Sequence, residues 1–255
     1  MSADTRSSAT GVASVDLGVA RGNRVLDGLT DAELTELLAD ATEVELVLST
    51  VLHEPGEPVT AVHFPLSGVI SLVTDLGDGD VVEAATVGFE GMSGISLYLG
   101  AGVPTERATV QVAGRAVTMS ADSFVRAAAV VDGPLYAMMR RYAQALFTQL
   151  ARNAGCNRVH SVQQRTARWM LTTADRMHSS TFELTQGFLA QMLTVRRASV
   201  SKAASALAEA GCITYVRGTL TVVDRGQLET YTCACYDVVR DATNQALAPA
   251  VAVLR

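Results

Sequence analysis

The chain has 255 residues, about half of them apolar, and a net charge of −6, so it is long enough for two ordinary domains with separate cores. No apolar run reaches the ~20 residues that a membrane span needs, and the first residues lack the apolar segment of a secretory signal. We therefore expect a cytoplasmic protein with no membrane partner.

The charge is distributed unevenly along the chain. Residues 1–130 carry 6 Lys and Arg against 18 Asp and Glu, a net charge of −12, whereas residues 155–230 carry 9 against 5, a net charge of +4. An acidic half joined to a basic half indicates two domains with different partners. Only the basic half is suited to bind phosphate.

The acidic half has the pattern of a small β domain. Residues 1–22 are rich in Ser, Ala, Thr and Gly and are predicted to be disordered. Thr30 and Glu33 form a capping box at the start of a short helix. Short alternating or β-branched segments then follow, separated by Gly, Pro and Asp turns, at residues 44–48, 59–64, 69–73, 81–87 and 108–117. Strands at this spacing predict a β-barrel or jelly roll over 23–133, with a helix from Ser120 to Val130 leading off it.

A long helix is predicted from Pro134, a favourable first helical residue, to Gly155. Apolar side chains three or four apart form one continuous seam along it: Leu135, Met139, Tyr142, Leu146 and Leu150. Such a seam is typical of a two-stranded coiled coil and predicts a dimerisation helix over 134–155. The alternative is that the seam packs on the barrel. A further helix, over 159–177, carries Trp169, which we interpret as a core residue.

Residues 184–213 have the pattern of a helix-turn-helix. Apolar residues fit two short helices that cross at a tight turn. Thr185 is a suitable N-cap for the first helix, and the small Ala190 allows the helices to approach closely. The second helix is predicted to begin near Arg196 and to end at Gly211.

Two β-branched runs follow this element and flank Arg217-Gly218, which predicts a hairpin. A helix-turn-helix followed by a hairpin is a winged helix, here over 156–232, with residues 233–255 left as a C-terminal tail. Arginine binds guanine edges, and Ser or Lys can reach bases or phosphates. We expect major-groove contacts from the outward residues of the second helix: Arg196, Arg197, Ser199, Ser201 and Lys202. Thr185 and Arg217 are expected to contact phosphate.

The order of elements, and three segments in particular, resemble the family of the catabolite activator protein and the fumarate–nitrate regulator (Crp/Fnr). The segments are Phe64-Pro-Leu-Ser-Gly68, Val87-Gly-Phe-Glu-Gly-Met92 and residues 184–201. The resemblance covers residues 23–230. It implies an α+β protein with a cyclic-nucleotide-binding-like sensor domain and a winged helix. It also implies a homodimeric transcription regulator whose partners are double-stranded DNA, RNA polymerase and an unidentified small-molecule effector.

The recognition helix departs from the family pattern at two positions. Ala198 stands where the family commonly has Glu, so the base preference should differ, because that Glu would accept from cytosine N4. Thr194 replaces the usual turn glycine, which is tolerable if its φ remains negative.

The effector site also departs from the pattern of cyclic-nucleotide receptors. Their Gly-Glu-Leu turn and Arg-Ser-Ala run correspond here to Gly88-Phe-Glu-Gly91 and Glu106-Arg-Ala-Thr-Val110. Glu90 and Arg107 are the candidate effector ligands. The separation is longer, the serine is missing, and one alignment turns Glu106 toward the phosphate, which it would repel. We expect no cofactor, and a cyclic nucleotide is disfavoured.

Other chemistry is not indicated. The cysteines are Cys156, Cys212, Cys233 and Cys235. Cys233-Ala-Cys235 is closer than a usual zinc or iron–sulfur ligand pair, so unpaired thiols and no metal site are expected. No Walker loop, HExxH or G-x-S-x-G motif is present, so no catalytic residue is assigned and the protein is not expected to be an enzyme. The alternative function is a sensor of a small molecule or cyclic nucleotide whose winged helix binds protein rather than DNA.

Overall fold

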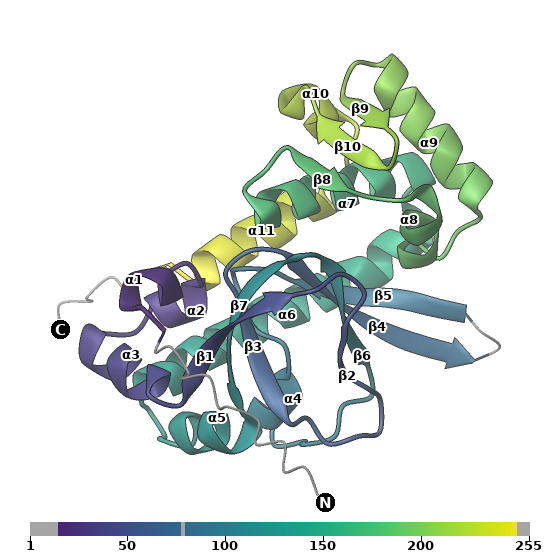
Figure 1. The fold of residues 1–255 in the computed structure, drawn as a ribbon. Helices are drawn as coiled ribbons and strands as arrows, with labels where there is room; N and C mark the ends of the chain where they lie inside the picture. Colours follow the sequence, from purple (N-terminus) through teal and green to yellow (C-terminus); the bar gives the residue numbers. More distant parts are fainter. Residues whose placement is uncertain (1–14, 78–79, 249–255) are drawn as a thin grey trace, which may run out of the picture.

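The computed structural model describes residues 15–77 and 80–248 (Figure 1). Three short helices open the described chain: α1 (Leu17–Ala20), α2 (Arg24–Asp27) and α3 (Asp31–Leu38). The predicted capping box at α3 is confirmed, because Thr30 Oγ1 accepts from the Glu33 amide and Glu33 Oε2 accepts from the Thr30 amide. Disorder was predicted over 1–22. Residues 1–14 lie outside the described chain, whereas 15–22 include α1, so the prediction is wrong for that part.

In the described part of the N-terminal half, seven strands form two antiparallel sheets that share one core. The strands are β1 (Ala41–Leu46), β2 (Val51–His53), β3 (Ala61–Pro65), β4 (Val69–Gly77), β5 (Asp80–Val87), β6 (Arg107–Val112) and β7 (Gly114–Ser120). One sheet has the order β1-β7-β3 and the other β2-β6-β4-β5. The predicted jelly roll is therefore present, but as two sheets rather than a ladder that closes into a barrel. The single strand predicted over 108–117 is two strands, one in each sheet, and β2 was not predicted.

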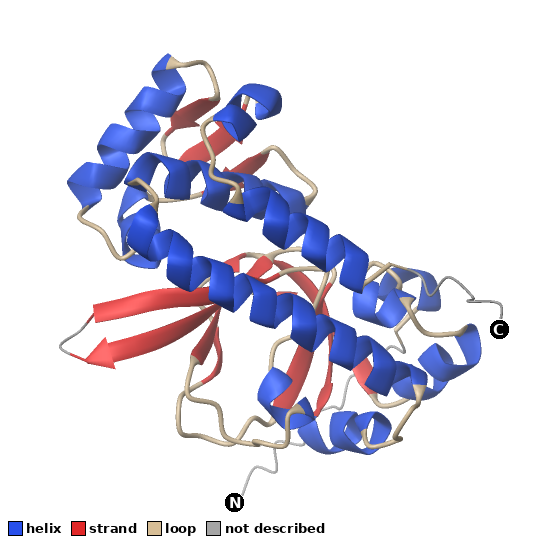
Figure 2. Ribbon diagram, turned by 180° about the vertical axis from the view of Figure 1, so that it is seen from behind, coloured by secondary structure: helices blue, strands red, loops and turns tan. Residues whose placement is uncertain are grey.

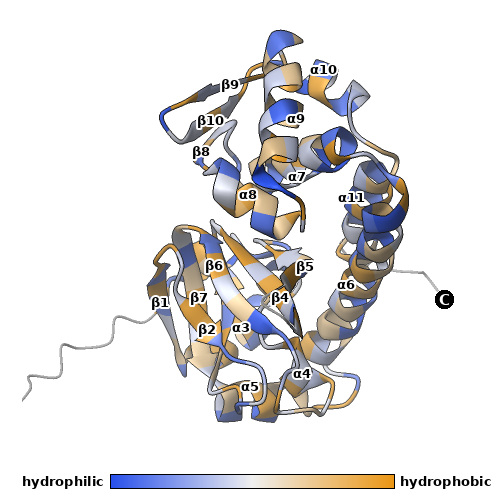
Figure 3. Ribbon diagram, turned by 90° about the vertical axis from the view of Figure 1, so that its right-hand side faces the viewer, coloured by the Kyte–Doolittle hydropathy of each residue, from blue (hydrophilic) through white to orange (hydrophobic). Residues whose placement is uncertain are grey.

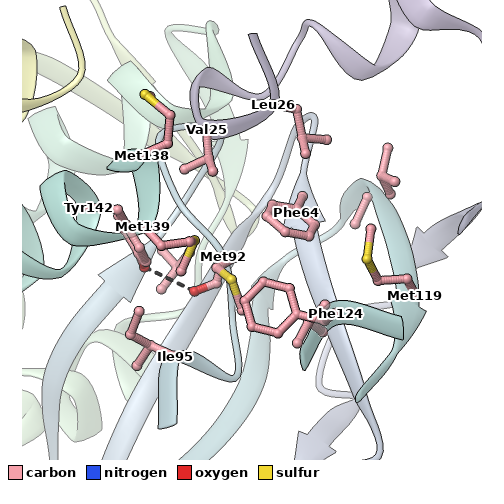
Figure 4. Packing of buried hydrophobic residues seen from close by; sticks show 14 of the residues in the cluster. Val25, Leu26, Phe64, Met92, Ile95, Met119, Phe124, Met138, Met139 and Tyr142 are labelled. Atoms are coloured by element: carbon pink, nitrogen blue, oxygen red, sulfur yellow. Dashed lines mark hydrogen bonds between the residues drawn. The ribbon is translucent and has the colours of Figure 1, made fainter. Parts of the chain in front are cut away.

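The space between the sheets is filled by side chains (Figure 4). Phe64 and Phe124 are fully buried with their ring centroids 6.2 Å apart, and Met92 and Met139 pack beside them. Phe124 belongs to α5 (Ala121–Ala128), which was predicted from Ser120 to Val130 and has Ser120 as its N-cap. The short helix α4 (Ile95–Tyr98) lies between β5 and β6 in sequence and contributes Ile95 to the same core. Apolar packing rather than a polar cradle thus occupies the inside of the jelly roll.

The turn from Val87 to Met92 packs closely against two helices that come later in the chain. A Cβ on Gly88 would lie 2.5 Å from Arg176 Cγ, and a Cβ on Gly91 would lie 2.2 Å from the Tyr142 ring. Tyr142 in turn donates from its hydroxyl to the Met92 carbonyl, at 3.0 Å. The two glycines are required by close approach, which explains this glycine-rich segment in structural terms.

Helix α6 (Pro134–Val159) is the longest element and crosses the whole molecule (Figure 2). Pro134 is its first residue, as predicted, but Gly155 does not end it. The helix continues because Cys156 is buried, and it stops at His160, where Ser161 starts the capping box of the next helix. The predicted coiled-coil seam packs on the jelly roll instead: Leu135, Met139, Tyr142 and Leu146 belong to its core. The large exposed apolar residues of α6 are Phe147, Leu150 and Val159.

The second half of the chain is a small α+β unit followed by a return helix. Its elements are α7 (Val162–Met177), β8 (Thr181–Glu183), α8 (Gln186–Met192), α9 (Arg197–Glu209), β9 (Ile213–Val216), β10 (Thr219–Val222), α10 (Arg225–Thr230) and α11 (Cys235–Ala246). Trp169 is buried in the core of this unit, as expected. None of the helices in the described residues is long and apolar enough to cross a membrane.

Helix α11 occupies the region predicted as a tail. It runs beside α6 in the opposite direction (Figures 1 and 3). Arg141 of α6 donates to the Ala248 carbonyl, and Leu247 enters the core of the jelly roll. Arg24 Nη1 donates to Asn244 Oδ1 at 2.7 Å. The end of the described chain is therefore bound to the N-terminal domain.

The close contact between Gly91 and the Tyr142 ring can be tested by replacing Gly91 with Ala. We expect Gly91→Ala to lower the free energy of unfolding by about 1–3 kcal/mol, because the buried Tyr142 ring has to move. Urea unfolding followed by circular dichroism would measure the change. Gly187→Ala is the matched control, because nothing lies within 4 Å of a Cβ at Gly187 in α8, and it should be neutral or stabilising by up to about 1 kcal/mol. Equal changes in the free energy of unfolding for the two substitutions would contradict a close contact at Gly91.

Candidate nucleic-acid interface

Helices α8 and α9 form the predicted helix-turn-helix. Thr185 caps α8 with its hydroxyl oxygen, which accepts from the Phe188 amide at 3.1 Å. Leu189, Val200 and Leu207 are buried where the helices cross. Arg196 is the N-cap residue of α9, and Gly211 follows the helix with a φ of 78°, as expected of a glycine C-terminal to a helix.

The turn between the helices differs from the expectation at one residue. Thr194 has a φ of 51°, so the negative φ that would make its replacement of the turn glycine tolerable is not present. A β-branched residue in the left-handed region is strained. The Thr194 hydroxyl donates to the Val81 carbonyl of β5 at 3.0 Å, and α8 packs against β5. The helix-turn-helix therefore rests on the sheet of the N-terminal domain, and Figure 3 shows α8 above β4 and β5.

The outer face of α9 carries the predicted DNA contacts. Arg196, Arg197 and Lys202 are exposed, and the first turn of α9 contains no acidic residue. Ser199 is half-buried. Ser201 is also half-buried, and its hydroxyl donates to Gln186 Oε1. Three cations are thus exposed in the N-terminal part of α9, whereas Ser201 is hydrogen-bonded within the motif.

The wing is a three-stranded sheet of order β8-β10-β9. Arg217 and Gly218 form its tip with positive φ angles of 50° and 87°, which two-residue hairpins of this kind require. Arg217 is exposed. It lines, with Thr185, a groove of about 350 Å³ that also contains Leu48 and Ser49 of the N-terminal domain. The two predicted phosphate contacts therefore lie together, on the side that faces the N-terminal domain.

The two candidate effector ligands do not form one site in this structure. Glu90 is buried and pairs with Arg176 of α7 at 2.6 Å. Arg107 is half-exposed and pairs with Glu54 at 2.6 Å. Val87, just before the turn that holds Glu90, pairs with Ile70 of β4, whereas Arg107 pairs with Val73 further along the same strand. Each residue therefore has its own ion-pair partner, and Glu90 follows β5 whereas Arg107 lies in β6, the two strands that flank β4.

A polar network that the sequence did not reveal connects the two halves of the molecule. Arg176 contacts Thr86 of β5 and Gln149 of α6 in addition to Glu90. A second connection joins β5 to α7, where Trp169 Nε1 donates to Glu83 Oε1 at 3.2 Å. Ser71 also donates to Glu83, at 2.7 Å. The spacing of these residues along the chain gives no signal, because the network depends on how three elements meet.

Glu83 has an unusual titration. Burial raises the pKa of its carboxyl to about 7, although the hydrogen bond from Ser71 and the charges of Arg168 and Arg176 lower it. Near neutral pH the Glu83 carboxyl therefore changes between its protonated and its charged form, at the contact between the two halves of the chain.

The comparisons with known proteins agree with this geometry. Residues 164–231 match the Crp-like helix-turn-helix domain. No curated protein matches the chain. Among solved structures, a Eubacterium rectale protein assigned to the Crp/Fnr family of transcriptional regulators aligns with a TM-score of 0.63 and 14% identity, over 83% of this chain and 98% of that one.

Two further structures have similar scores. A CRP-family transcriptional regulator from Thermus thermophilus aligns with a TM-score of 0.62 and 18% identity, over 74% of this chain and 95% of that chain. The c-di-GMP-responsive global regulator CLP of Xanthomonas campestris aligns with a TM-score of 0.61 and 12% identity, over 76% and 100%. At these identities the structures establish the fold.

A helix-turn-helix with an exposed cationic second helix and a wing defines a DNA-binding transcription regulator. Residues 164–231 are similar to the Crp-like helix-turn-helix domain, and the whole fold is that of solved regulators assigned to the Crp/Fnr family, in agreement with the resemblance indicated by the sequence.

The Glu83 titration should be visible in both stability and fluorescence. Because the pKa of Glu83 is raised from 4.5, its contribution to stability is complete below about pH 4.5 and is lost as the pH rises toward 7. Glu83→Gln keeps an acceptor for Trp169 and removes the titration. We expect the stability difference between variant and wild type to grow in favour of the variant from pH 4.5 to 7, in urea unfolding curves.

The fluorescence of Trp169, the only tryptophan, gives an independent readout. Wild type should show a transition near pH 7 that is absent from Glu83→Gln. A transition that persists unchanged in the variant would assign it to another group.

Proposed function

We propose that this regulator is a homodimer that reads a palindromic DNA site with α9. The observation that carries the proposal is the exposure of three cations, Arg196, Arg197 and Lys202, in the N-terminal part of α9. A helix of this kind fits the major groove, where arginine binds guanine O6 and N7. Ala198 is also exposed and supplies only a methyl group, so readout of cytosine N4 by a carboxylate is not available at that position.

The individual roles differ along the helix. We assign base readout to Arg197, with Arg196 and Ser199 beside it, and phosphate contact to Lys202. Ser201 can contribute once its hydroxyl leaves Gln186. Thr185 and Arg217 are assigned to phosphates flanking the groove.

The position of Thr185 and Arg217 supports regulation by domain movement. Both line the groove beside Leu48 and Ser49 of the N-terminal domain, and Thr194 is hydrogen-bonded to Val81. For both residues to reach phosphate, the winged helix has to separate from this side of the sheet. We propose that an effector bound by the N-terminal domain, or a change of partner, shifts this equilibrium.

The identity of the effector is a separate question. The solved relative from Xanthomonas campestris is c-di-GMP-responsive, but here Glu90 is paired with Arg176 and separated from Arg107, which disfavours a cyclic nucleotide held by these two residues. An unidentified small molecule and RNA polymerase are proposed as partners from the family resemblance alone.

The proposed dimer contact is a strip on α6 that the jelly roll leaves uncovered. Its exposed residues lie three or four apart: Ala137, Arg140, Gln144, Phe147, Ala151, Ala154 and Arg158. Phe147 is 66% exposed, and Leu150 beside the strip is 39% exposed. A second copy of α6 packed on this strip would bury both, as in a two-stranded coiled coil.

Substitutions in α9 should separate base readout from phosphate contact. Arg197→Ala is expected to cost about 1–3 kcal/mol of binding free energy and to relax the preference at one base pair of each half-site. Lys202→Ala is expected to weaken binding to all sequences and to lower the salt slope by about 1. Duplexes selected from a random library and titrated over a range of salt concentrations would measure both.

Each variant controls for the other, because both side chains are exposed on the same helix. An Arg197→Ala protein with unchanged affinity and preference would overturn the assignment. Failure of the wild type to bind any duplex in a salt-dependent manner would favour a winged helix that contacts protein instead.

Introducing a charge on the strip should break the dimer. We expect Phe147→Glu to shift the protein from dimer to monomer in sedimentation velocity, because two carboxylates would face each other across the contact. Its affinity for a palindromic site should fall accordingly. Leu99→Glu, at a residue 65% exposed outside α6, is the control and should remain dimeric. A dimeric Phe147→Glu protein would place the interface elsewhere.

A further inference from the structure

Three of the four cysteines and one histidine meet at the base of the winged-helix domain. Cys156 lies in the last turn of α6 and His160 follows its end, whereas Cys233 and Cys235 lie at the start of α11. Cys156 Sγ is 3.6 Å from Cys233 Sγ, and Cys235 Sγ is 3.7 Å from His160 Nδ1. One ligand atom from each of the four residues lies within 4.8 Å of all the others.

These distances match a single tetrahedral ion. Zinc binds cysteine sulfur at about 2.3 Å and histidine nitrogen at about 2.0 Å, which places the ligand atoms of a tetrahedral site about 3.6–3.8 Å apart. The Cys156–Cys233 and Cys235–His160 distances lie in that range. Small side-chain rotations would bring the other pairs of ligand atoms, now up to 4.8 Å apart, into it as well. Three cysteines and one histidine are a common donor set of structural zinc sites. A polynuclear iron–sulfur cluster would need its thiolates further apart.

The surroundings of the cluster suit a metal–thiolate centre. The three thiols are buried, with exposed fractions of 0% for Cys156, 4% for Cys233 and 5% for Cys235, and they pack together as a cluster separate from both domain cores. His160 is half-buried. Buried thiols that face a histidine across their free side form a closed shell, which is typical of a structural rather than a catalytic site.

The charge at this place also needs a partner. Three thiolates around a divalent ion carry a net charge of −1. Arg165 is buried beside Cys156, and the positive charge of Arg168 acts on all three thiols. Nε of both arginines is buried without a hydrogen-bond partner. Buried cations are costly unless they are compensated, and an anionic metal centre would compensate these two.

We infer that Cys156, His160, Cys233 and Cys235 bind one thiophilic divalent ion, zinc, as a structural site. The expectation of unpaired thiols without a metal considered Cys233 and Cys235 alone. It did not include Cys156 and His160, which lie four residues apart at the end of α6 and reach the pair only because α11 folds back on α6.

The site would fix the orientation of the winged helix. Cys156 and Cys233 are 77 residues apart, and the segment between them contains the whole of α7, the helix-turn-helix and the wing. His160 lies directly at the junction of α6 and α7. An ion bound here closes that long loop at its base, and it holds the junction and the start of α11 in one arrangement.

The test begins with the metal content of the full chain. Protein purified in a thiol reductant from zinc-supplemented medium should contain one zinc per chain by plasma mass spectrometry. The Cys233→Ser/Cys235→Ser and His160→Gln proteins should lose most of it. Cys212→Ala is the matched control, because Cys212 is a buried thiol of the helix-turn-helix core outside the cluster, and it should keep the full content.

A second measurement covers variants that fail to fold. Wild type stripped with a chelator under reductant should take up one Co²⁺ per chain. It should then show the intense visible absorption of tetrahedral cobalt with thiolate ligands, which added Zn²⁺ should remove. Absence of metal after reconstitution would overturn the inference. So would a Cys156–Cys233 disulfide in the protein isolated with reductant, or bound iron with sulfide.

Discussion

The arrangement of the molecule depends on one buried ion pair. Arg176 of α7 reaches out of the winged-helix domain and binds Glu90 at 2.6 Å, with both side chains less than a tenth exposed. Thr86 and Gln149 complete its contacts, so a single guanidinium joins β5, α6 and α7. Removal of one member of a buried pair leaves an uncompensated charge, which typically costs about 3–5 kcal/mol. The relative position of the N-terminal domain and the winged-helix domain is therefore set by polar contacts that are strong only while water is excluded from them. Water entering this contact would weaken all of them together.

Features determined by neighbouring residues could be predicted from the sequence. The cap at Thr185, the crossing of α8 and α9 and the tight wing turn at Arg217-Gly218 depend on local spacing and turn chemistry, and all are present. The exposure of Lys202 follows from the same periodicity, because a helix that buries Val200 and Leu207 turns Lys202 outward. Arg197 lies three residues before Val200, so its exposure at the first position of α9 does not follow from this spacing. The position of the candidate DNA-binding helix could thus be predicted from the sequence.

Features determined by distant partners were missed or misassigned. An apolar seam identifies the buried face of α6 but not what covers it, and the jelly roll rather than a second copy covers Leu135 to Leu146. Helix α11 is short and largely polar, so its helical state depends on packing against α6. The hydrogen bond from Thr194 to Val81, a residue more than a hundred positions earlier, gives no signal in the sequence. Glu90 lies in the turn that was expected to bind an effector, but in the structure its carboxylate is paired with Arg176 of α7.

The return of α11 to the N-terminal domain gives the chain an unusual topology for a two-domain protein. Leu247 is part of the jelly-roll core, and Asn244 is hydrogen-bonded to Arg24, so the winged-helix domain is inserted within the N-terminal domain rather than attached at its end. An inserted domain is attached by two covalent crossings, here before α7 and after α10. It cannot swivel freely as a domain on one linker can, and its movement is restricted to rotation about the line that joins the two crossings. The backbone path therefore limits the directions in which α9 can move relative to the N-terminal domain.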